Sequence, residues 1–102
     1  MKKITGLNEP LVDLAEKPLQ DERGEVLMAK HIISGALGRG RSDDPVRAID
    51  IALKIRNADG ELVLDDADVE VAKKALLNDQ GWSDIVRAAG LRCLGTAEPV
   101  AG

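Results

Sequence analysis

The stretch SDDPVRAIDIALKIRNADGELVLDDADVEVAKKALL, from Ser42 to Leu77, decides the fold. Its first part predicts a helix over Pro45–Arg56. Asp43 or Asp44 can act as the N-cap, and proline suits the first helical position because its missing N–H would have no helical partner there. The start of this helix is the clearest boundary signal in the chain.

The helix predicted over Pro45–Arg56 is apolar on nearly all sides. Most of its polar side chains, Arg47, Asp50 and Lys54, recur at three- and four-residue steps and form one narrow stripe. A helix with so little polar surface is typical of a buried position. We therefore expect this helix to be the centre of the core.

The rest of the stretch predicts a turn, a short strand and a second helix. Residues 57–60 (NADG) break the first helix, and Glu61–Leu64 has the composition of a strand. Asp65 or Asp66 can cap a helix that runs to about Leu77, with acidic residues in its first turn as the helix dipole favours.

The flanking segments complete an α+β fold that is mostly helical. We expect an irregular N-terminal hairpin between Leu11–Leu14 and Leu19–Gln20, joined by Glu61–Leu64 as a third strand. Apolar spacing predicts a further helix over Leu27–Leu37, and Ser83 can cap a fourth that ends near residue 94. Residues 1–95 are predicted to form one domain, and residues 96–102 a mobile tail of small residues.

Composition narrows the class of protein. The chain has 102 residues, of which 44% are hydrophobic and 31% charged, as in an ordinary globular domain with one core. Trp82 is its only aromatic residue, so the core is built from aliphatic side chains. The net charge of −4 and the lack of aromatic stacking platforms argue against a nucleic-acid-binding surface.

The chain carries the features of a cytoplasmic protein. Its single cysteine, Cys93, cannot form an internal disulfide, which suits a reducing compartment. The N-terminus lacks the apolar region of a signal peptide, and no apolar run is long enough to span a membrane. We expect no membrane association.

Five acidic residues near the centre of the chain resemble a calcium loop at first sight; they are Asp59, Asp65, Asp66, Asp68 and Glu70. With Gly60 at the invariant glycine position, the first ligand position falls on Ile55, which has no side-chain oxygen. Helix capping and the helix dipole already account for these acids. We therefore predict no metal site.

The segment Gly38–Ser42 (GRGRS) contains two arginines that could meet phosphate oxygens. The segment lacks the lysine and spacing of a P-loop, and two aspartates follow directly, which favours a solvated loop between helices. Arg39 and Arg41 remain candidates for contact with a partner. Trp82 is a third candidate because tryptophan is enriched at binding hot spots, although packing against the core is the favoured role.

His31 is the only histidine and Cys93 the only cysteine, and together they are the candidate base and nucleophile. No third group that would orient the base is identifiable, and one histidine plus one cysteine are too few to hold zinc. We predict no catalytic residues and no cofactor.

Three segments together resemble small proteins encoded by tailed phages and prophages: Leu7–Leu14 (LNEPLVDL), Lys17–Glu25 (KPLQDERGE) and Glu61–Asp68 (ELVLDDAD). The opening strand, helical middle and acid-capped helix are also loosely similar to phage tail assembly chaperones. The resemblance covers residues 2–77, implies a phage origin and a host-cell cytoplasmic location, and brings no catalytic residue with it.

These observations favour a small, non-catalytic accessory protein that binds another protein, to regulate or inhibit it or to help an assembly. One alternative is a nucleic-acid binder that uses Arg39, Arg41, Arg47 and Arg56. Another is a structural or tail-assembly component of a phage particle, and a third is an enzyme that pairs His31 with Cys93. A homodimer is expected to suit so short a chain, since a shared interface adds buried area.

Overall fold

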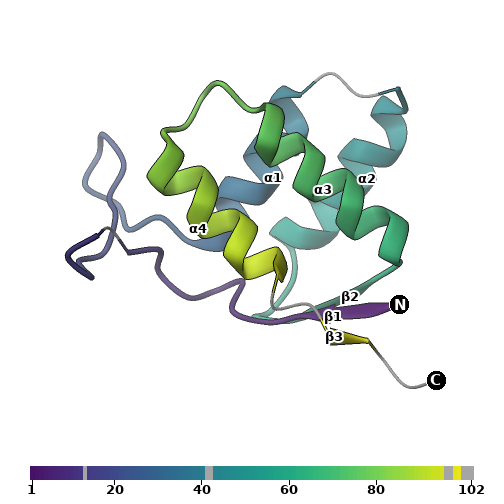
Figure 1. The fold of residues 1–102 in the computed structure, drawn as a ribbon, viewed down its shortest axis with the longest axis horizontal. Helices are drawn as coiled ribbons and strands as arrows, with labels where there is room; N and C mark the ends of the chain where they lie inside the picture. Colours follow the sequence, from purple (N-terminus) through teal and green to yellow (C-terminus); the bar gives the residue numbers. More distant parts are fainter. Residues whose placement is uncertain (13, 41–42, 96–97, 100–102) are drawn as a thin grey trace.

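The computed structural model describes residues 1–12, 14–40, 43–95 and 98–99, and it has four helices and three short strands in the described residues. In chain order the elements are β1 (Lys2–Ile4), α1 (Ala29–Arg39), α2 (Pro45–Arg56), β2 (Leu62–Leu64), α3 (Asp66–Asn78), α4 (Asp84–Gly95) and β3 (Glu98–Pro99). Figure 1 shows α3 and α4 in front of α1 and α2, with the strands along the lower edge. The prediction of a mostly helical α+β fold is confirmed.

The sheet is built differently from the predicted one. Its strand order is β2-β1-β3, and β1 pairs antiparallel with both neighbours, so that Lys3 faces Val63 on one side and Glu98 on the other. The N-terminal strand is therefore Lys2–Ile4. Glu98–Pro99 lies in the segment predicted to be a mobile tail, yet its backbone pairs with β1; the remainder of that segment lies outside the described residues.

The segment predicted as a hairpin, between Leu11–Leu14 and Leu19–Gln20, is an irregular meander. It contains isolated bridges rather than a ladder, among them Val12 with Pro18. Leu27 also belongs to this meander, because its backbone bonds to both Leu11 and Leu19 at 2.8 Å. Helix α1 consequently begins at Ala29, two residues later than predicted.

Helix α1, and not α2, lies at the centre of the core. It packs against α2, α3 and α4, and its side chains Ile32, Ile33 and Ala36 are fully buried. The prediction that α2 is central was wrong. Helix α2 buries one face through Ala48, Ile51, Ala52 and Ile55, while its opposite face is exposed.

Helix α4 crosses α3 and α1 at a glycine. A β-carbon at Gly90 would lie 3.1 Å from Leu76 Cδ1 and 3.6 Å from Ile32 Cγ2, so a larger residue would require the Leu76 side chain to shift. The helix continues through this position to Gly95. Gly90 therefore marks a close helix crossing, and the helix ends at Gly95, next to the predicted end near residue 94.

Candidate protein-binding surface

The outer face of α2 carries an uninterrupted apolar stripe. Val46, Ile49 and Leu53 are 80%, 45% and 53% exposed, respectively. Their spacing of three and four residues places them along one line of the helix, on the side opposite the buried Ile51 and Ile55. We call these three residues the α2 stripe.

Helix α2 is fixed in place by an N-cap hydrogen bond and by an ion pair to α3. The Asp44 side chain accepts a hydrogen bond from the Arg47 backbone N–H at 3.0 Å and so caps the helix, as the sequence predicts. Arg47 in turn joins α2 to α3, because its Nε and Nη2 lie 2.7 and 2.6 Å from Asp68 Oδ1. Asp68 is buried, which makes this pair a defined contact between the two helices.

Charges are distributed unevenly along α2. Asp43 and Asp44 stand at its N-terminal end, and Lys54 and Arg56 lie in its last turn. Asp50 lies between them and forms an ion pair with Lys54 at 3.2 Å, as its spacing predicts. Because Arg47 in the first turn is paired with Asp68 of α3, the helix has an acidic N-terminal end and a basic C-terminal end, with the α2 stripe between them.

Two of the three residues predicted to contact a partner, Arg39 and Trp82, lie together at the C-terminal end of α1. Arg39 donates to both carboxylate oxygens of Asp79, at 3.3 and 3.0 Å, and its guanidinium carbon lies 5.6 Å from the centre of the Trp82 ring. Arg41 lies outside the described residues.

Arg39, Asp79 and Trp82 form a cluster, here called the Arg39 cluster, in which the backbone at Gly81 comes close to the Arg39 guanidinium. A β-carbon there would lie 2.8 Å from Arg39 Nε, so any side chain would displace the guanidinium. The Asp79 side chain is only 3% exposed, whereas that of Arg39 is 45% exposed. The cluster ties the α3–α4 connection to the end of α1, and Trp82 packs against the core.

The acidic residues that resembled a calcium loop are dispersed among separate contacts. Asp59 accepts a hydrogen bond from Asn8, Asp66 pairs with the N-terminal amine, and Asp68 pairs with Arg47. Asp65 stands at the N-cap of α3 without a side-chain cap bond, and Glu70 pairs with Lys73 at 3.5 Å. In the part of the chain that the structure describes, no group of three or more potential metal ligands occurs.

His31 and Cys93 have different surroundings. Desolvation lowers the pKa of His31 below its usual value, and the nearby charges of Lys30 and Arg56 lower it further. Burial raises the pKa of the Cys93 thiol to about 11, with a smaller contribution from Glu9. The thiol donates to the Thr5 carbonyl oxygen at 3.3 Å, which favours its neutral form.

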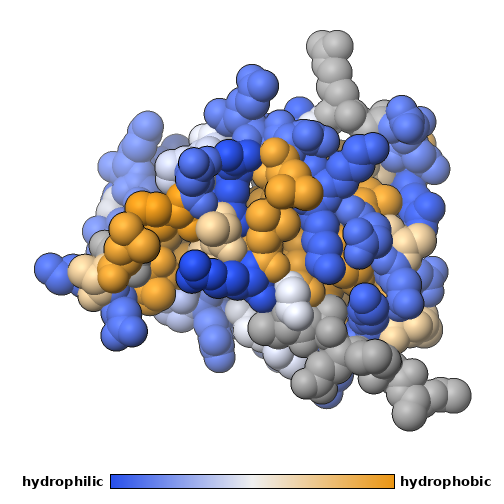
Figure 2. All heavy atoms as spheres, viewed as in Figure 1, coloured by the Kyte–Doolittle hydropathy of each residue, from blue (hydrophilic) through white to orange (hydrophobic). Residues whose placement is uncertain are grey.

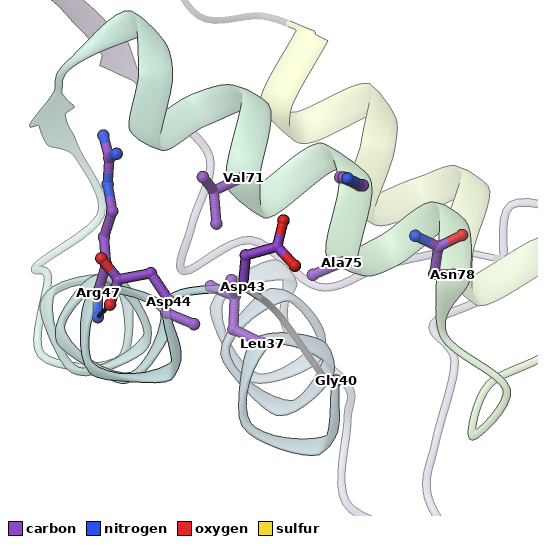
Figure 3. Close-up of a pocket in the computed structure, with 10 residues that line it drawn as sticks. Leu37, Gly40, Asp43, Asp44, Arg47, Val71, Ala75 and Asn78 are labelled. Atoms are coloured by element: carbon purple, nitrogen blue, oxygen red, sulfur yellow. Dashed lines mark hydrogen bonds between the residues drawn. The ribbon is translucent and has the colours of Figure 1, made fainter.

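A cavity of about 330 Å³ lies beside the start of α2. Figure 3 shows that its walls come from the end of α1, the start of α2 and one side of α3, with the Asp43 carboxylate directed toward α3. Leu37, Val71 and Ala75 form apolar walls, and both acidic and basic side chains line the rim. Neither His31 nor Cys93 lines this cavity.

The α2 stripe was missed because its three residues look like core residues. The spacing of Val46, Ile49 and Leu53 could have identified it, since a second apolar line on a helix that already has one implies a second partner.

Figure 2 shows that the face viewed there is mostly hydrophilic, with hydrophobic side chains gathered in a few areas. Among the described helices, none has the length and apolar character needed to cross a bilayer.

Comparison of the chain with protein-family models, with curated proteins and with solved structures found no match.

Proposed function

We propose that this chain is a small, non-catalytic accessory protein that acts by binding protein, and that the α2 stripe is its docking surface. The observation that carries the proposal is the exposure of Val46, Ile49 and Leu53 along one line of a capped helix. Contiguous apolar surface of this kind is characteristic of an interaction site. The resemblance of three segments to phage-encoded proteins supports an accessory role, either in regulating a partner or in assembling a particle.

Two of the four arginines invoked for nucleic-acid binding are less available than the sequence suggests. Arg39 pairs with Asp79 and Arg47 pairs with Asp68, so each already faces a carboxylate. A phosphate would have to displace an intramolecular partner at both positions, in a protein of net charge −4. This observation favours a protein partner over a nucleic acid.

Site-specific photo-cross-linking in cells of the native host tests the proposal. A benzophenone-bearing phenylalanine replaces Val46 or, as the matched control, Leu77, which is 62% exposed on α3. We expect a discrete cross-linked protein from position 46 and none from position 77. Adding Ile49→Arg to the Val46 probe is expected to abolish the product, because a charge in the stripe cannot be desolvated without a partner.

The proposal fails if the two probes give the same products, or if Ile49→Arg leaves the position 46 product unchanged while the protein keeps its helical circular dichroism spectrum.

A further inference from the structure

We propose that a second copy of this chain covers the α2 stripe, with the two α2 helices packed antiparallel about a two-fold axis near Ile49. The inference rests on the proposed function, because it names the partner of that surface. The stripe is nearly symmetrical about Ile49, with Val46 three residues before it and Leu53 four residues after it. An antiparallel pair therefore sets Val46 of each copy against Leu53 of the other, as an isologous interface requires.

The charges of α2 favour this orientation over a parallel one. Its N-terminal end carries Asp43 and Asp44, and its C-terminal end carries Lys54 and Arg56. Arg47 in the first turn is already paired with Asp68 of α3. In an antiparallel pair the acidic end of each helix lies beside the basic end of the other. In a parallel pair the like-charged ends would lie together, which costs free energy. A second copy thus matches the stripe in both apolar pattern and charge.

The size of the surface sets the expected strength of the dimer. Stable interfaces bury roughly 800 Å² on each partner, and one face of a helix of 12 residues offers less than that. We therefore expect a weak dimer in concentration-dependent exchange with the monomer, with a dissociation constant on the order of tens of micromolar.

Sedimentation equilibrium over a range of protein concentrations measures this self-association. Ile49→Arg is expected to weaken it roughly tenfold or more, because two guanidinium groups would meet across the axis. Leu77→Arg, a change of the same kind at an exposed site on α3, is expected to have no effect. Association is also expected to weaken as salt is added, since opposite charges meet; strengthening with salt would indicate the parallel pair.

Disulfide cross-linking then tests the geometry. In a Cys93→Ser background, Ile49→Cys is expected to form a covalent dimer readily with itself. A mixture of the Val46→Cys and Leu53→Cys chains is expected to give the mixed dimer faster than either chain alone gives its own. Predominant Val46–Val46 and Leu53–Leu53 products would overturn the antiparallel arrangement.

The outcomes separate this inference from the proposed function. A chain that stays monomeric at all concentrations, yet cross-links a different protein from position 46 in the host, refutes self-association and leaves the docking surface in place. A chain that is monomeric and gives no specific product from position 46 refutes both.

Discussion

At the scale of single residues, Arg39 is a half-exposed side chain that three neighbours hold in place. It contacts the buried carboxylate of Asp79, lies against the Trp82 ring and fills the space that Gly81 leaves open. An arginine suits this site because its planar guanidinium can bond a carboxylate and stack on a ring at once. Two residues that the sequence offered as partner contacts thus also contact each other, and Arg39 helps to hold the α3–α4 connection.

Replacing Arg39 by alanine is expected to lower the free energy of unfolding by about 2 kcal/mol, because it leaves the Asp79 carboxylate buried without its partner. Solvent around the half-exposed guanidinium keeps the loss below that of a fully buried pair. Urea denaturation measures the change. The exposed Arg23→Ala serves as the control and is expected to stay within about 0.5 kcal/mol of the parent chain. Equal effects of the two changes would contradict a structural role for the pair.

Cys93 links stability to alkaline pH. Its pKa in the folded chain is about 11, compared with 9.0 for an unperturbed thiol, so the unfolded state loses this proton first as pH rises. The thiol's contribution is fully present below about pH 9 and is lost between about pH 9 and about pH 11. Cys93→Ser removes this titration. Urea midpoints across that range should fall more steeply for the parent chain than for the variant, and parallel profiles would refute the linkage.

At the scale of elements, α2 and α3 have the same type of N-cap residue but different capping hydrogen bonds. Each follows an aspartate at the N-cap, yet only Asp44 accepts a hydrogen bond from its helix, at 3.0 Å from the Arg47 nitrogen. Asp65 makes no side-chain cap bond, and Asp66 and Asp68 occupy the first turn of α3. The identity of the cap residue could be predicted from the sequence, whereas its hydrogen bond depends on local backbone angles.

We predict that Asp44→Ala destabilises the protein by about 1 kcal/mol, because it leaves a helical N–H without its acceptor. Asp65→Ala is expected to cost only a few tenths of a kcal/mol, since it removes a favourable charge near the helix dipole and no hydrogen bond. Thermal unfolding of both variants provides the comparison. A loss at Asp65 as large as that at Asp44 would show that the cap bond is not the source of the difference.

At the scale of the whole molecule, two layers of helices share one core, and α1 occupies its centre (Figure 1). In a chain of 102 residues a helix at the side of such an arrangement cannot be covered on all faces. Helix α2 has that position, and its second apolar face remains exposed. The self-association proposed above belongs to this scale, because it would complete the burial that a single chain leaves unfinished.

The sequence by itself determined the helices, most clearly α2, whose predicted bounds agree with the structure at Pro45 and Arg56. Caps, turn residues and apolar spacing act between near neighbours in the chain, and so they can be read locally. The sequence also predicted a short strand over Glu61–Leu64, which begins one residue before β2 and ends with it, and the Asp50–Lys54 ion pair.

Only the tertiary structure decided which helix is central, which segments pair with β1, and which apolar line of α2 faces solvent. These features depend on contacts between residues far apart in the chain, such as Lys3 with Glu98 and Arg39 with Asp79. An apolar residue in the sequence, such as Val46, fits the core and an interface equally well, because the hydrophobic effect does not specify which surface buries it. The arrangement of the other helices makes that choice.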